Sequence, residues 1–135
     1  MKNGETFESA AIIGIGLLGG SLARAMKAKG LCGNIRGCGR TKSRLDFALA
    51  NGIADSVTFD PAEAASGAEL VVVCTPVGLI PEIIERISPV LAPGAIVTDV
   101  GSTKSFIVER AESIMPEGTH FVGSHPMAGS ENAGV

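Results

Sequence analysis

A glycine-rich stretch near the N-terminus constrains this chain more than any other feature. Residues 12–21 read Ile-Ile-Gly-Ile-Gly-Leu-Leu-Gly-Gly-Ser, so apolar residues lead into a Gly-x-Gly-x-x-Gly pattern, and a helical pattern follows at once. The first glycine of such a pattern permits a tight strand-to-helix turn, the second lets the backbone approach a pyrophosphate, and the third lets the helix lie close to the strand. The stretch therefore predicts a dinucleotide at a helix N-terminus, and the alternative is a glycine-rich turn without a ligand. The residues expected to contact the dinucleotide are Gly14, Gly16, Leu17, Leu18 and Gly19.

Apolar runs alternate with amphipathic runs along the rest of the chain, as they do in repeated βαβ units. The clearest strand is Leu70–Cys74, which is continuous, apolar and mostly β-branched, as a parallel sheet buried on both faces requires. The pattern predicts an α/β fold, an open, doubly wound parallel sheet of the Rossmann type, and the length of 135 residues suits one dinucleotide-binding domain, 1–135. Strands are expected at 10–15, 34–38, 56–59, 70–74, 95–99 and 120–124, and helices at 18–29, 43–50 (with Ser43 as N-cap), 61–66, 79–91 and 104–115.

Composition and charge exclude several classes of protein. The net charge is −3 with both signs interspersed, so no basic run indicates nucleic acid. The longest apolar stretch, 70–80, is interrupted by Pro76 and Gly78 and is too short to span a membrane. The three cysteines are too widely spaced for a disulfide framework or a zinc site, and no metal is expected. We expect a cytoplasmic protein that acts on a small molecule.

The segment after the second predicted strand bears on which dinucleotide is bound. An Asp or Glu at this place accepts a hydrogen bond from the ribose 2′-hydroxyl and selects NAD. Residues 36–43 contain no acid, and Arg40 stands where the acid would be, with Thr41 and Ser43 beside it. Because a guanidinium can bind a 2′-phosphate through two parallel hydrogen bonds, the segment favours NADP over NAD. The alternative is that Arg40 stacks on the adenine and that NAD is used.

Three further segments, 74–77, 99–104 and 123–131, are polar or rich in Gly and Pro, and each follows a predicted strand. Ligands of open α/β sheets bind at the carboxyl ends of the strands, so these segments and the glycine-rich turn are expected to form one crevice. Thr75 and Pro76 are expected to border the nicotinamide ribose, and Gly101 to contact the cofactor.

His125 is the strongest candidate for chemistry. An imidazole titrates near neutral pH and suits a general base, and Pro126 restricts the backbone that carries it. The alternative is a loop histidine whose partners are backbone groups. Ser102 could cap the helix predicted near Lys104, hydrogen-bond a substrate hydroxyl, or do both. Ser130 and Glu131 could reach a polar substrate or cap a following segment.

Taken together, these segments resemble a known family. Val-Val-Cys-Thr-Pro-Val at 72–77, Val-Thr-Asp-Val-Gly-Ser-Thr-Lys at 97–104 and Phe-Val-Gly-Ser-His-Pro-Met-Ala-Gly-Ser-Glu at 121–131 follow the glycine motif. In this order they resemble the prephenate/arogenate (cyclohexadienyl) dehydrogenases of tyrosine biosynthesis, over essentially the whole chain. The His-Pro-Met-Ala-Gly segment combined with Asp-x-Gly-Ser-x-Lys is specific, whereas many dehydrogenases share the glycine motif.

The resemblance implies an NAD(P)-dependent oxidative decarboxylation of prephenate or arogenate. His125 would accept the proton of the ring hydroxyl while hydride leaves the same carbon for the nicotinamide, and Ser102 would hydrogen-bond that hydroxyl and His125. The family also carries a C-terminal helical dimerisation domain, which is absent from these residues. The chain is therefore expected to be a fragment of a homodimeric two-domain enzyme, and to turn over poorly by itself.

Two other functions stay open at this stage. One is another dehydrogenase with the same nucleotide-binding domain, such as a β-hydroxyacid dehydrogenase or a pyrroline-carboxylate reductase. The other is a non-catalytic NADP-binding module that acts as a sensor or subunit.

Overall fold

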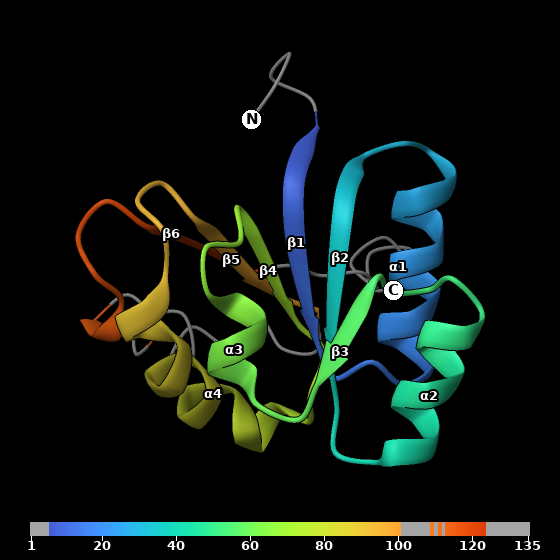
Figure 1. Cartoon of the computed structure of the whole chain (residues 1–135). Helices are drawn as coiled ribbons and strands as arrows, with labels where there is room; N and C mark the ends of the chain where they lie inside the picture. Colours follow the sequence, from blue (N-terminus) through green and yellow to red (C-terminus); the bar gives the residue numbers. More distant parts are fainter. Residues whose placement is uncertain (1–5, 101–108, 110, 112, 124–135) are drawn as a thin grey trace, which may run out of the picture.

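The structure, a computed structural model, describes residues 6–100, 109, 111 and 113–123 (Figure 1). Its described part contains one sheet of six strands, all parallel, in the order β3-β2-β1-β4-β5-β6. This order is that of a doubly wound dinucleotide-binding fold, so the predicted fold class is confirmed. The strands are β1 (Phe7–Ile13), β2 (Cys32–Cys38), β3 (Ser56–Thr58), β4 (Leu70–Val73), β5 (Ile96–Asp99) and β6 (His120–Gly123). The helices are α1 (Leu17–Ala28), α2 (Lys42–Ala50), α3 (Pro61–Ala65) and α4 (Ile80–Ile87), with short 3₁₀ turns η2 (Val77–Leu79) and η3 (Ser88–Val90).

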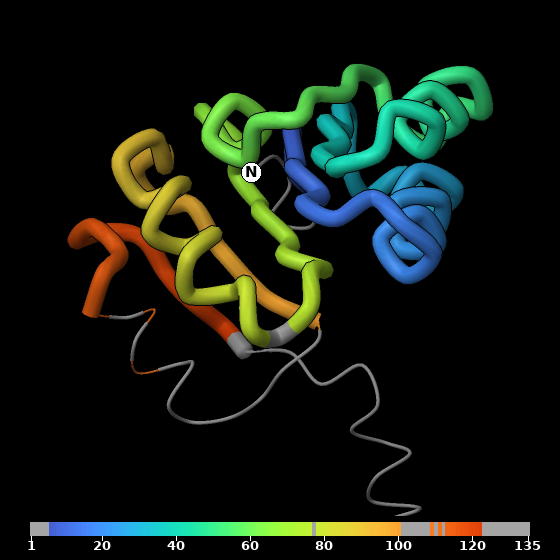
Figure 2. Tube along the Cα trace, turned by 90° about the horizontal axis from the view of Figure 1, so that it is seen from below, coloured from blue at the N-terminus to red at the C-terminus, as the bar shows by residue number. Residues whose placement is uncertain are grey.

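Helices cover both faces of the sheet, α1 and α2 on one side and α3 and α4 on the other (Figures 1 and 2). Successive side chains of a strand point to opposite faces, so the central strand β1 contributes to both apolar cores. Ala10 and Ile12 belong to the core beneath α1 and α2, whereas Ala11 and Ile13 belong to the core beneath α3 and α4. Two buried faces explain why the central strands are continuously apolar instead of alternating.

The strand β1 begins three residues earlier than predicted, at Phe7, and ends earlier, at Ile13. It begins there because the Phe7 amide donates a hydrogen bond of 2.9 Å to the Leu31 carbonyl. It ends there because Gly14 has a φ of +98°, which turns the chain out of the sheet. The sequence located the strand correctly, but its ends depend on contacts with the neighbouring chain segments.

The prediction that Ser43 caps the second helix is wrong. The helix α2 begins at Lys42, and Thr41 occupies the N-cap position. The amides of Arg44 and Leu45 both donate to the Thr41 carbonyl, each at 3.1 Å. Ser43 therefore lies within the first turn of the helix and not before it. The Nζ of Lys42 also lies 2.9 Å from an Asp46 carboxylate oxygen, an i, i+4 pair that suits a helix starting at Lys42.

The helix predicted over 79–91 is divided in the structure. The α-helical part is only Ile80–Ile87, preceded by η2 and followed by η3. Pro89 explains the end, because it has no amide hydrogen and its ring clashes with the preceding turn of an α-helix. The Ser88 hydroxyl donates to the Ile84 carbonyl at 2.7 Å, which satisfies a carbonyl at this end. On the apolar face of α4, Ile80, Ile84 and Ile87 are buried, while Ile83 is only half-buried.

The last predicted helix, 104–115, lies mostly outside the described residues; of its positions, Glu109, Ala111, Ser113 and Ile114 are helical. The predicted capping role of Ser102 also lies outside them. Within the described part of the chain, no helix is long and apolar enough to cross a bilayer.

Two adjacent glycines of α1 provide a matched test of the packing at the sheet edge. A Cβ on Gly19 would lie 2.3 Å from the Gly14 carbonyl oxygen, whereas a Cβ on Gly20 would meet nothing within 4 Å. We expect Gly19→Ala to lower the free energy of unfolding by about 1–3 kcal/mol because of overpacking. Gly20→Ala should raise it by about 0.5–1 kcal/mol because alanine is the better helix former. Urea denaturation measures both values, and equal effects of the two substitutions would contradict the packing described.

Candidate nucleotide-binding site

The glycine-rich turn has the geometry that the sequence predicts. Gly14 has a positive φ, and a Cβ on it would lie 2.9 Å from the carbonyl carbon and oxygen of Cys74. The amides of Gly14 and Ile15 both donate to the Cys38 carbonyl, at 2.8 and 2.9 Å. The turn is therefore held between the ends of β2 and β4. The close approach at Gly19 then places the start of α1 directly over the end of β1.

The N-terminus of α1 is suited to an anion. Gly16 occupies the N-cap position without a side-chain cap, and the first turn contains no acidic residue. Unpaired amide N–H groups and the helix dipole make such an end a binding site for phosphate. Two large apolar side chains stand beside it, Leu17 at 89% and Leu18 at 50% exposure.

A cavity of about 780 Å³ opens beside the ends of β1, β2 and β4, and we call it the switch-point crevice. It lies where the strand order reverses, between β1 and β4, which is the usual ligand position in this kind of sheet. Figure 2 looks onto this edge of the sheet. Its size is that of a small-molecule site. The lining includes the glycine-rich turn and the residues after β2, β3 and β4, among them Gly14, Gly16, Gly39, Arg40, Thr41, Phe59, Thr75, Pro76, Leu79 and Ile83.

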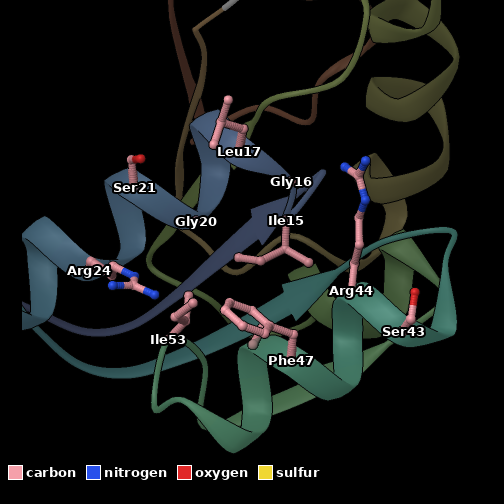
Figure 3. Close-up of a pocket in the computed structure, with 11 residues that line it drawn as sticks. Ile15, Gly16, Leu17, Gly20, Ser21, Arg24, Ser43, Arg44, Phe47 and Ile53 are labelled. Carbon is pink, nitrogen blue, oxygen red and sulfur yellow. The ribbon is translucent and has the colours of Figure 1, made fainter.

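A second space lies between α1 and α2, and we call it the α1–α2 groove (Figure 3). It measures about 690 Å³, and the Phe47 ring faces Ile15 and Ile53 across its floor. Arg24 lies along one wall, and Arg44 extends from the other toward the turn at Gly16. The groove is thus apolar at its centre and basic at its margins.

The structure brings most of the predicted cofactor residues together, but not all of them. Those that line the switch-point crevice are Gly14, Gly16, Arg40, Thr41, Thr75 and Pro76. Leu17 and Ser43 line the α1–α2 groove instead, and Leu18 and Gly19 line neither space. Gly101, Ser102, His125, Ser130 and Glu131 lie outside the described residues, so their roles stay predictions.

Arg44 is a residue that the sequence reasoning missed. It lines both spaces, and its Nη1 lies 2.9 Å from the position that a Cβ on Gly16 would take. The guanidinium is therefore beside the phosphate-binding turn. The available signal was its position in the first turn of α2, four residues after Arg40.

The basic side chains differ in whether they already have an acidic partner. Three form ion pairs of 2.7–2.9 Å: Lys27 with Asp55, Lys42 with Asp46 and Arg86 with Asp60. Neither Arg40 nor Arg44 forms an ion pair or a side-chain hydrogen bond with another described residue. Since an anion would have to displace an existing partner from the first group, these two arginines are the better candidates to bind one.

Two thiols line the switch-point crevice. Burial raises the pKa of the Cys38 thiol to about 11, and Asp60 adds to the increase. Burial, with a contribution from Asp99, raises the pKa of the Cys74 thiol to about 12. Both are therefore thiols at neutral pH and act as small apolar residues. No group of three or more His, Cys, Asp or Glu that could hold a metal occurs among the residues that the structure describes.

Comparison with known proteins shows the family to which this chain belongs. The family model described as prephenate dehydrogenase, nucleotide-binding domain, matches residues 22–135. A cyclohexadienyl dehydrogenase of Zymomonas mobilis is 37% identical over 130 residues, which are 95% of this chain and 43% of that protein. The chain thus spans less than half the length of this relative.

Two solved structures are similar in both sequence and fold. Prephenate dehydrogenase from A. aeolicus, crystallised with hydroxyphenyl propionate and NAD+, is 32% identical with a TM-score of 0.79, and the match covers 90% of this chain and 42% of that one. Arogenate dehydrogenase from Synechocystis is 33% identical with a TM-score of 0.77, and the match covers 87% of this chain and 40% of that one.

The two crevice thiols should resist alkylation. At pH 8 the folded chain should hold about 100-fold less thiolate at Cys38 than an ordinary cysteine does. Iodoacetamide labelling followed by mass spectrometry should show Cys38 and Cys74 reacting slowly in the native chain and rapidly in urea. The pKa of Cys32 is raised too, but without a large shift, so Cys32 should react first and serves as the internal control. Preferential native labelling of Cys74 would contradict this.

Proposed function

Because the chain belongs to the family of prephenate dehydrogenase nucleotide-binding domains, we propose that it forms the cofactor-binding part of an NAD(P)-dependent prephenate or arogenate dehydrogenase. The observation that carries the proposal is the switch-point crevice, where the glycine-rich turn meets the ends of β2 and β4. The whole enzyme would oxidise and decarboxylate a cyclohexadienol ring that bears a hydroxyl and a carboxylate. Crystals of the A. aeolicus relative contain NAD+ and an aromatic acid, which supports this class of cofactor and substrate.

The residues present fit a nicotinamide dinucleotide. The uncapped start of α1 offers amide donors to the pyrophosphate, and Gly14 and Gly19 allow the turn to lie close to the sheet. Arg40 and Arg44, neither paired with another described residue, would bind a ribose 2′-phosphate together with Thr41. We therefore propose NADP as the preferred cofactor, and NAD as the alternative that the A. aeolicus structure keeps open.

His125 and Ser102 are the residues proposed to act in the reaction itself. The nicotinamide, when bound, accepts the hydride. His125 accepts the proton of the ring hydroxyl, and Ser102 hydrogen-bonds the same hydroxyl and orients His125. Loss of the ring carboxylate as CO₂ then makes the ring aromatic. Thr75 and Pro76 would border the nicotinamide ribose, Gly101 would contact the cofactor, and Ser130 and Glu131 would bind the polar groups of the substrate.

The full-length enzyme is proposed to be longer than this chain. The matched relatives are more than twice as long as this chain. We propose that the full-length protein adds a C-terminal helical domain, forms a homodimer through it and works in the cytoplasm. By itself this chain should bind cofactor but turn over poorly.

Removal of the two crevice arginines should change the cofactor preference. Arg40→Asp should weaken NADPH binding about 10- to 100-fold and leave NADH binding within a few-fold, because charge-assisted hydrogen bonds to the 2′-phosphate are lost. Arg44→Ala should also weaken NADPH binding more than NADH binding, but it should weaken both, because the Arg44 guanidinium lies beside Gly16 of the glycine-rich turn. NADPH and NADH fluorescence titrations measure both affinities. Lys42→Ala is the matched control, since Lys42 is largely exposed and already paired with Asp46. A native preference for NADH would reject the NADP assignment.

Loss of the proposed base should abolish turnover but not cofactor binding. In the full-length protein, His125→Ala should lower kcat at least about 100-fold with either prephenate or arogenate, because the proton acceptor is removed. His120→Ala is the control, since His120 is exposed at the start of β6. Near-normal turnover of His125→Ala would refute the assignment. Activity on neither substrate, combined with tight NADPH binding, would favour another dehydrogenase or a binding module.

A further inference from the structure

An exposed aromatic ring lines the switch-point crevice. Phe59 is 58% exposed and lines the crevice. It directly follows β3, in which Thr58 pairs with Cys38 of β2, and the Gly39 amide donates to the Thr58 carbonyl at 3.3 Å. Phe59 therefore lies beside the Gly39–Arg40 turn that is proposed to bind the adenosine ribose.

Phe59 has no role in either apolar core of the described structure. The residues buried in the two cores, and the half-buried residues packed against them, do not include it. An isolated exposed hydrophobic residue is ordinary on a protein surface. This one, however, faces a cavity at the edge where the fold binds its ligands.

The backbone that carries the ring is held on both sides. The Asp60 amide donates to Thr58 Oγ1 at 3.1 Å, and Thr58 Oγ1 donates in turn to the Glu63 carboxylate. Asp60 Oδ1 accepts hydrogen bonds from the Ala62 amide at 3.0 Å and from Arg86 at 2.9 Å. These bonds tie the backbone on both sides of Phe59 to α3 and α4, so less backbone freedom has to be lost on binding.

The strand order decides which part of a dinucleotide would reach Phe59. A pyrophosphate at the start of α1 lies over the end of β1, with β2 and β3 to one side and β4 to the other. Because the residue after β2 selects the adenosine ribose, the adenosine half extends toward β2. The base, one step farther from the pyrophosphate, then extends toward the end of β3. The half-buried aliphatic side chains of Leu79 and Ile83 line the same crevice.

We propose that Phe59 binds the adenine of the cofactor by stacking on one face of the base, and that Leu79 and Ile83 provide the apolar surface for the rest of it. The inference rests on the proposed cofactor-binding function and assigns a residue to base recognition. An aromatic ring offers a flat apolar partner to a base without hydrogen-bond readout. The crevice would then recognise the two ends of the adenosine differently, the 2′-phosphate by charge and the base by stacking.

The test compares variants of Phe59 in the intact chain. Phe59→Ala should weaken binding of both NADPH and adenosine 2′,5′-bisphosphate about 10-fold, and by the same factor, because both probes carry the adenine. Phe59→Tyr, which keeps the ring, should stay within two-fold of the native chain, whereas Phe59→Leu should resemble Phe59→Ala. The matched control is Phe47→Ala, since Phe47 is equally exposed, at 55%, but lines only the α1–α2 groove. Fluorescence titration and calorimetry give the affinities, and thermal denaturation verifies that each variant is folded.

The outcomes separate this inference from the proposed function. If the native chain binds NADPH and Phe59→Ala binds both probes within two-fold of it, the stacking role is wrong while the cofactor site stands. An equal loss in Phe47→Ala, or a loss confined to NADPH, would also overturn it. If the native chain binds neither NADPH nor NADH, the proposed function and this inference fail together.

Discussion

The contact of Gly19 with the carbonyl oxygen of Gly14 is the constraint on which the site depends. A Cβ at this position would lie 2.3 Å from that oxygen, so α1 could not lie as close to the end of β1 with any other residue. The close approach places the uncapped N-terminus of α1 over the sheet edge, where β1 meets β2 and β4. The same glycine-rich turn thereby shapes the fold and leaves amide donors available for an anion.

Charged side chains that form ion pairs with one another differ in their role from those that line the candidate site. Asp60 both caps α3 and pairs with Arg86 of α4, and Asp55 joins Lys27 of α1 to the Ile35 amide of β2. Such exposed or half-exposed pairs add little energy individually, but they connect α3 to α4 and α1 to the strand β2. Arg40 and Arg44 have no comparable partner among the described residues. The site therefore combines fixed walls with basic groups whose hydrogen-bonding capacity is still available to a ligand.

Much of the fold could be predicted because its signals are local. The largely β-branched run at Leu70–Cys74 predicts a buried strand, which the structure has at Leu70–Val73, and the glycine spacing predicts the tight turn before α1 that the structure shows. The predictions differ from the structure at the ends of helices and strands, which depend on single residues and on contacts between distant segments. The amphipathic pattern predicts one helix over 79–91, but α4 ends before Pro89 and 3₁₀ turns flank it, and Thr41 rather than Ser43 occupies the N-cap position of α2. The site was predicted less completely, since Arg44 was missed and Ser43 lines the other groove.

By itself, the sequence determined the class of the fold, the glycine-rich turn between β1 and α1 and the absence of an acid after the second strand. These features depend on the backbone freedom of glycine, on apolar periodicity and on residue identity, all of which act over a few positions. Only the tertiary structure decided that Phe59, Leu79 and Arg40 line one cavity. Their meeting depends on the order β3-β2-β1-β4, which brings Arg40 and Leu79 to one cavity although they are 39 positions apart in the sequence, and no short-range pattern records the order in which strands pair.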